Sequence, residues 1–202
     1  MSENHEHTHN AYRRTLRAAT VGNFAVAGAE LFVATKYGES VIWALFIHDF
    51  SDALGHALHE YTERVDSQRT RTFVNRVRKV GAGAVLVSAF GVGAHSAYEL
   101  ATSQAEPSLN AATVAVAGAS LGLNTIITRR HRKNPVDAAG YHDSLEHNSK
   151  DMKSSGAALA ATVISPIAPF APSVAGLYIS YVSVGIAKHI YDDAHEKIEE
   201  QN

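Results

Sequence analysis

Two pairs of histidine and aspartate share one spacing in this 202-residue chain. His48 is followed four positions later by Asp52, and His147 is followed four positions later by Asp151. On a helix, positions i and i+4 lie on one face, so each pair would direct an imidazole and a carboxylate toward one point. Two such helices facing each other would supply two nitrogens and two carboxylate oxygens, a suitable tetrahedral shell for Zn²⁺. The sequence therefore predicts a metal site formed by these four residues.

Other polar residues are weaker candidates for this site. A third pair with the same spacing, His189 and Asp193, lies near the polar C-terminus and is expected to be solvated surface. His56 could line the same pathway as His48 or face the membrane interface, and His95 is expected to be a packed or hydrogen-bonded side chain. Asp49 falls on a different face of the helix from Asp52 and is expected to pair with a neighbouring helix. Four residues could either orient the ligands or join helices: Asn23, Glu30, Asn124 and Ser155.

The segments that must position these pairs are apolar. Each has about the 20 residues that a membrane-spanning helix needs, and small residues, which allow close helix packing in lipid, are abundant in them. The six stretches are 17–36, 40–60, 80–100, 109–128, 152–170 and 172–190. The mean hydropathy of −0.11 is nevertheless low for a membrane protein. There is no cysteine, so disulfides and thiolate ligands are excluded.

Basic residues are sorted by alternate connections. Of the 18 Lys and Arg residues, Lys36 alone lies in one of the other connections. The rest lie before or at the start of the first stretch, between the second and third, between the fourth and fifth or at the start of the fifth, or near and after the end of the sixth. The positive-inside rule places those segments in the cytoplasm. The predicted fold is all-α, a six-helix transmembrane bundle with both termini cytoplasmic, multi-pass in the cell (inner or plasma) membrane.

We expect three regions along the chain. Residues 1–11 would be a His-rich cytoplasmic tail, 12–192 the six-span domain, and 193–202 a short polar C-terminal tail. The tail contains His5, His7 and His9, a tract that could collect metal ions loosely or have no role. It has no apolar core of the kind that a secretory signal peptide requires.

The chain resembles the transmembrane domain of the cation diffusion facilitator family over most of residues 12–192. The segment GESVIWALFIHDFSDALGHAL (38–58) is similar to the family's second-helix pattern, and HNSKDMKSSGAA (147–158) is similar to its fifth-helix pattern. Asn23 and Glu30 match the first-helix pattern loosely, and Asn124 resembles the end of the fourth. Leu45 departs from the pattern, since the family often has Asp there. The chain ends at Asn202, so the family's C-terminal cytoplasmic domain is expected to be absent.

This resemblance implies export of divalent cations from the cytoplasm in exchange for protons, usually by a homodimer. It makes His48, Asp52, His147 and Asp151 the ligands of the transported ion, and this ligand set is associated with zinc in the family. Zn²⁺ would then be the substrate, although other divalent transition metals suit such ligands. The expected mechanism is alternating access, in which metal and protons compete for one site.

Two other functions stay open from the residues alone. One is a non-transporting zinc-binding helical bundle that stores or senses metal, and the other is a membrane haem protein with histidine ligands. The Gly-x-Ser-x-Gly and P-loop patterns are absent, so the chain is not expected to be an enzyme. The basic residues are scattered among connections, so no nucleic-acid partner is expected.

Overall fold

The computed structural model describes residues 2–64, 67–102, 109–133 and 141–199, with side chains from Arg14 onward except those of 16, 59–60, 62–64 and 141–147. The described residues form helices and no strands. The six helices are α1 (Ser2–Tyr37), α2 (Ser40–Arg64), α3 (Gln68–Thr102), α4 (Ala111–Lys133), α5 (Tyr141–Ile164) and α6 (Ala171–Glu199). The prediction of an all-α fold with six helices is therefore confirmed.

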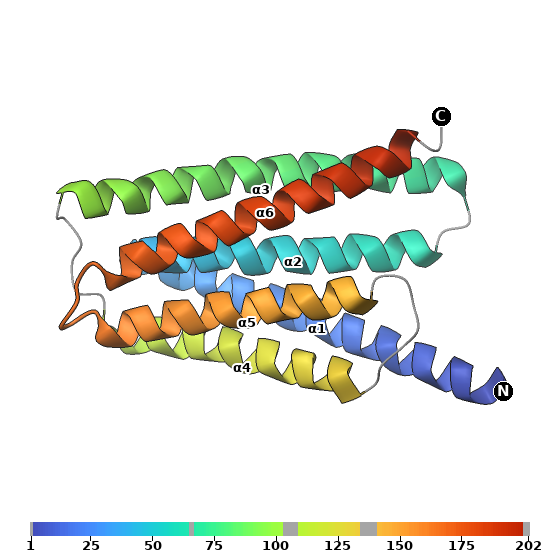
Figure 1. Ribbon diagram of the computed structural model, residues 1–202, viewed down its shortest axis with the longest axis horizontal. Coiled ribbons are helices and arrows are strands. Elements are labelled where there is room, and N and C mark those ends of the chain that lie inside the picture. The colour runs from blue at the N-terminus through green and yellow to red at the C-terminus, as the bar shows by residue number, and fades with distance from the viewer. Residues whose placement is uncertain (1, 65–66, 103–108, 134–140, 200–202) are drawn as a thin grey trace.

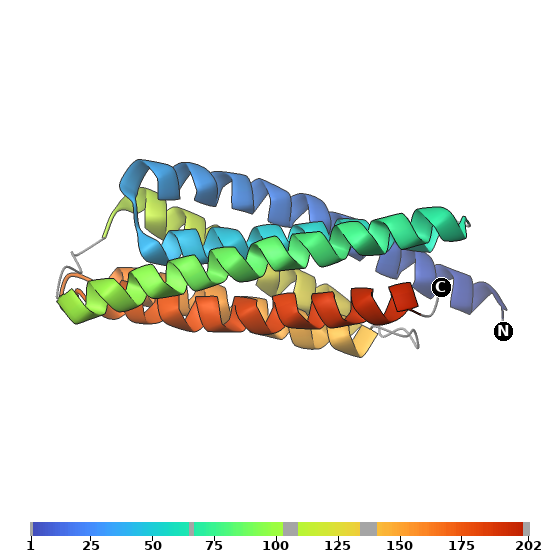
Figure 2. The same cartoon turned by 90° about the horizontal axis from the view of Figure 1, so that it is seen from above.

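The helices run side by side along the long axis of the molecule, and successive helices are antiparallel (Figures 1 and 2). α3 packs along α6, α1 along α2, and α4 along α5, while α2 also contacts α5 and α6. The beginning of α1 and the end of α6 lie at the same end of the bundle (Figure 1). The ends of α2 and α4, which carry or precede the basic connections, lie there too, so we call it the basic end.

Local sequence sets where several helices begin and end. Gly38 has a φ of 72° and its N–H donates to the carbonyl of Ala34, which closes α1 with the left-handed residue that glycine adopts without strain. Asn110 caps α4, because its side-chain oxygen accepts from the N–H of Thr113 at 2.8 Å. Pro166 follows the end of α5, where proline cannot continue a helix, and Pro172 stands in the first turn of α6, where its missing N–H removes no helical bond.

The helices extend beyond the apolar stretches marked in the sequence. α5 begins at Tyr141, ahead of the predicted start at 152, because apolarity marks membrane-spanning residues and a helix can continue into polar ones. Residues of the predicted N- and C-terminal tails also belong to helices, since α1 begins at Ser2 and α6 continues to Glu199. The side chains of His5, His7 and His9 are outside the described residues, so the metal-collecting role of that tract stays a prediction.

Three helices are long and apolar enough to cross a membrane. Among the described residues these are α1 over Arg17–Tyr37, α3 and α4. Large apolar side chains also cover the outside of the bundle: Val80 and Val87 on α3 are 74% and 72% exposed, and Tyr181 on α6 is 78% exposed. Many buried side chains are polar, and apolar side chains outside with polar ones inside suit a lipid surrounding. These features indicate a membrane protein.

At the end opposite the basic end, two glutamates form hydrogen bonds that link the ends of neighbouring helices. Glu99 near the end of α3 accepts hydrogen bonds from the hydroxyls of Ser40 and Ser173, both at 2.7 Å, and so ties the beginnings of α2 and α6 together. Glu39 accepts from the side chains of Asn110 at 2.6 Å and Thr113 at 2.9 Å. These contacts join the beginning of α2 to α3, α4 and α6.

At the basic end, an ion pair joins α3 to α6. The guanidinium of Arg78, 9% exposed, lies 2.8 Å from the Asp193 carboxylate, which also receives a hydrogen bond from Lys197. Burial alone would raise the pKa of Asp193, but Lys197 and Arg78 outweigh it and hold the pKa below its ordinary value of 3.8. Asp193 therefore adds stability above that ordinary value, and the contribution is lost as the pH falls through the lowered value.

Replacing Asp193 by asparagine is expected to lower the free energy of unfolding by about 1–2 kcal/mol at pH 7, because it leaves the nearly buried Arg78 with a neutral partner. The deficit relative to wild type should shrink as the pH falls below 3.8, where wild-type Asp193 becomes protonated as well. Thermal unfolding in detergent, followed by circular dichroism, measures both effects. The matched control is Asp192→Asn, whose exposed ion pair with Lys188 should contribute less than about 0.5 kcal/mol. An equal loss in the two variants would contradict the assignment.

Candidate metal site

The middle of α2 buries charged and polar side chains where the rest of its inner face is apolar. Val41, Ile42 and Leu45 pack into the hydrophobic core, and the next turns of the helix bring His48 and Asp52 into the same interior. Leu45, the residue that departs from the family pattern, is thus a core residue. Ionisable groups at this depth are costly in free energy and usually functional.

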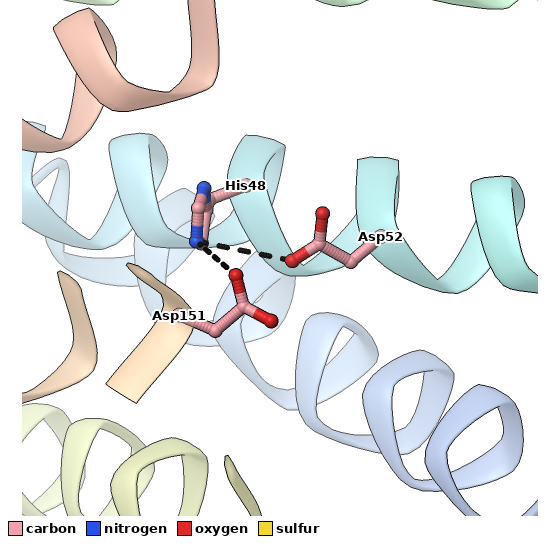
Figure 3. A group of neighbouring side chains, drawn as sticks. All are labelled: His48, Asp52 and Asp151. Carbon is pink, nitrogen blue, oxygen red and sulfur yellow. Dashed lines mark ion pairs between the residues drawn. The ribbon is translucent and has the colours of Figure 1, made fainter. Parts of the chain in front are cut away.

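Three of the predicted ligands converge between α2 and α5 (Figure 3). His48 Nε2 lies 3.2 Å from Asp151 Oδ1 and 3.8 Å from Asp52 Oδ2. One ligand atom from each residue lies within 4.8 Å of the other two. The three residues are only 1%, 2% and 0% exposed (His48, Asp52 and Asp151), so the group is enclosed by the bundle.

These separations suit a single ion. Two ligand atoms at about 2.1 Å from a tetrahedral Zn²⁺ are about 3.4 Å apart, close to the 3.2 Å and 3.8 Å separations from His48 Nε2. Two buried carboxylates next to one imidazole also carry negative charge that a divalent cation would balance. The arrangement could therefore hold a divalent metal.

The second nitrogen of the His48 ring points away from both carboxylates (Figure 3). This Nδ1 lies 3.2 Å from the hydroxyl oxygen of Ser183 on α6. No sequence pattern pointed to Ser183, because a serine among the many small residues of that stretch carries no signal of its own. Its contact with His48 depends on how α6 packs against α2.

His147 belongs to α5, but its side chain is outside the described residues, so its place in the site stays a prediction. The two lysines that flank Asp151, Lys150 and Lys153, are exposed, whereas Asp151 is fully buried. Neighbouring positions of a helix point to different faces, and this keeps the two ammonium groups out of the buried site.

Asp49 faces away from the three ligands, as its position on α2 predicts. Its carboxylate accepts a hydrogen bond of 2.6 Å from Ser120 on α4, and the Glu30 carboxyl on α1 lies close to it. Ser155 contacts Ser120 and donates to the main-chain carbonyl of Asp151 at 2.9 Å. Of the four residues that could either orient ligands or join helices, Asn124 and Ser155 join α4 to α5, because the Asn124 amide donates to the Ser155 hydroxyl at 3.1 Å.

The other histidines singled out in the sequence do not join this group within the described part of the chain. His95 pairs with Glu99 at 3.3 Å on the outside of α3, in line with the expected hydrogen-bonded role. His189 is exposed, and Asp193 pairs with Arg78 and Lys197, so the third pair does not form a metal site. His56 is half-buried two turns beyond His48.

Fold and site together define a class: a helical membrane protein with a buried histidine–aspartate group that could hold a metal ion. Comparison with models of protein families and with curated proteins finds no match to this chain. The likeness to the cation diffusion facilitator family thus rests on the motifs alone, and the homodimer that it implies stays a prediction.

Proposed function

We propose that this protein carries divalent transition-metal cations, Zn²⁺ first, across the cell membrane in exchange for protons. The observation that supports it most is the buried group of His48, Asp52 and Asp151, whose ligand atoms lie within 4.8 Å of one another. A site that only stabilises the fold has no need to bury carboxylates within the bilayer, which costs free energy. A transported ion must cross the bilayer, so transport requires a binding site at that depth.

We propose a six-span topology with both termini in the cytoplasm. α2, α5 and α6 have lengths similar to the three apolar helices and pack among them. The hydropathy of α2 is lowered by His48, Asp49 and Asp52, which are buried inside the bundle, and that of α5 by the buried Asp151 and the exposed Lys150 and Lys153. The basic segments gather at one end of the bundle, and this asymmetry supports a cytoplasmic location for that end (Figure 1).

The site also suggests how metal and proton movements would be coupled. Imidazole and carboxylate bind metal only when deprotonated, so a proton that enters the site weakens the metal's binding. In the cytoplasm-facing state the deprotonated group would take up the cation. After the helices rearrange to open the site outward, protonation would release it. Metal and protons would then move in opposite directions through one set of residues.

Transport into inverted membrane vesicles tests this function. Vesicles loaded with a zinc-sensitive dye and a pH-sensitive dye should show Zn²⁺ uptake with proton release, and Asp52→Ala should reduce both to background. Asp192→Asn, an exposed change on α6, should leave both unchanged. If Asp52→Ala vesicles take up Zn²⁺ as fast as wild type, the proposal is wrong. If wild-type protein binds Zn²⁺ but vesicles show no uptake, storage or sensing is the better function.

A further inference from the structure

Ser183 faces His48 from the side opposite the carboxylates. Its hydroxyl oxygen lies 3.2 Å from His48 Nδ1, and both residues are buried. The single hydroxyl proton is donated to the main-chain carbonyl of Ile179 at 2.9 Å. The oxygen can therefore only accept a hydrogen bond from the His48 ring. The contact with Nδ1 is then a hydrogen bond only if Nδ1 carries a proton.

This bond decides which ring nitrogen can bind a cation. A neutral imidazole has one ring proton, and placing it on Nδ1 leaves a lone pair on Nε2. Nε2 is the nitrogen that lies 3.2 Å from Asp151 and 3.8 Å from Asp52. Histidines that bind metal commonly donate their other ring N–H to an oxygen, which fixes both the tautomer and the orientation of the ring.

We propose that Ser183 is a positioning residue of the cation site, which holds His48 in the Nδ1–H tautomer and so keeps Nε2 available to a divalent cation. The inference rests on the proposed function, since it requires a cation at His48. It also brings a third helix into the site. The ligands belong to α2 and α5, whereas Ser183 belongs to α6, so a displacement of α6 that breaks this bond would weaken cation binding.

Neighbouring serines of α6 provide a matched comparison. Ser180 is also buried, at 4% exposed, but it faces α3, where a Cβ on Gly93 would lie 3.3 Å from its own Cβ. Ser180→Ala therefore removes the same hydroxyl group from the same helix without touching His48. Ser183→Thr keeps a hydroxyl, and threonine in a helix can still bond the carbonyl four residues earlier.

The first measurement is the affinity of the purified full chain for Zn²⁺, by competition with a chromophoric chelator. Ser183→Ala should bind Zn²⁺ roughly 10–100-fold more weakly than wild type, as for other losses of a partner that orients a metal-binding histidine. Ser180→Ala and Ser183→Thr should remain within about threefold of wild type. Equal affinities of Ser183→Ala and wild type would overturn the inference.

A nitrogen NMR spectrum of protein labelled at histidine provides a readout that lost packing alone would not change. The His48 signals are those missing from His48→Gln. With one equivalent of Zn²⁺, they should show a protonated Nδ1 and a metal-bound Nε2 in wild type and Ser180→Ala, and a smaller metal-bound Nε2 signal in Ser183→Ala. Metal-bound signals of equal size in Ser183→Ala and wild type would also overturn the inference. Failure of the proposed function looks different, since wild-type vesicles would then take up no Zn²⁺, whether or not Ser183→Ala changes the binding of the metal to the purified protein.

Discussion

Zn²⁺ is expected to bind roughly a hundredfold more weakly to Asp151→Asn than to wild type. The substitution preserves the shape of a fully buried side chain but removes one of the two carboxylates beside His48 Nε2. An amide oxygen is a weaker ligand for Zn²⁺ and brings no charge to offset the dication. The loss should be about 3 kcal/mol of binding free energy, which corresponds to that factor. Competition with a chromophoric chelator at pH 7 measures it.

Asp49→Asn provides a second buried carboxylate for comparison. Asp49 lies one residue from His48 but faces Ser120 and Glu30. Asp49→Asn should therefore lower the affinity for Zn²⁺ much less than Asp151→Asn does. If both variants weakened binding equally, the metal would depend on the total buried charge and not on the three convergent residues. If neither changed it, the ion would bind elsewhere in the chain.

Zinc is expected to stabilise the wild-type protein strongly against heat. A ligand that binds only the folded state adds about 2.7 kcal/mol at a concentration 100 times its dissociation constant. For a chain of this size each kcal/mol shifts the melting temperature by about 2–4 °C, so the rise should be roughly 5–11 °C. The shift should be absent from the double variant Asp52→Asn/Asp151→Asn. Thermal unfolding in detergent, with Zn²⁺ or with a chelator, measures both proteins.

The same experiment tests the electrostatic argument. With the chelator present, the double variant should melt no lower than wild type, because it removes two carboxylates from a nearly dry interior. A double variant that melts much lower without metal would mean that Asp52 and Asp151 serve mainly to hold the bundle together. A zinc-induced rise of the same size in both proteins would place the metal at another site.

The sequence predicted the parts of this protein that local periodicity controls. Apolar stretches of spanning length marked all six helices, and the four-residue spacing placed His48 and Asp52 on one face of α2. The same reasoning placed Asp49 on another face, where it meets α4. Periodicity suffices here because a helix has fixed geometry whatever its neighbours are.

Contacts between helices could not be predicted in the same way. The meeting of Asp151 with His48 was expected because both belong to H-x-x-x-D pairs in or beside apolar stretches that resemble a family pattern, but no such signal pointed to Ser183 or Ser120. Their roles depend on which face α6 and α4 turn toward α2, and single serines occur throughout these helices. Hydropathy was an equally limited guide to which helices span the membrane, since buried ionisable residues lower the mean hydropathy of the helices that carry them.

X-ray absorption at the zinc edge of the purified protein, loaded with one equivalent of Zn²⁺, tests directly whether His48 binds the metal. We expect low-atomic-number ligands at about 2.0–2.2 Å with the multiple scattering typical of imidazole. That imidazole signal should decrease in His48→Gln and remain in His95→Gln, whose histidine lies on the outside of α3. A spectrum that His48→Gln leaves unchanged would show that His48, and the group built around it, does not bind the metal.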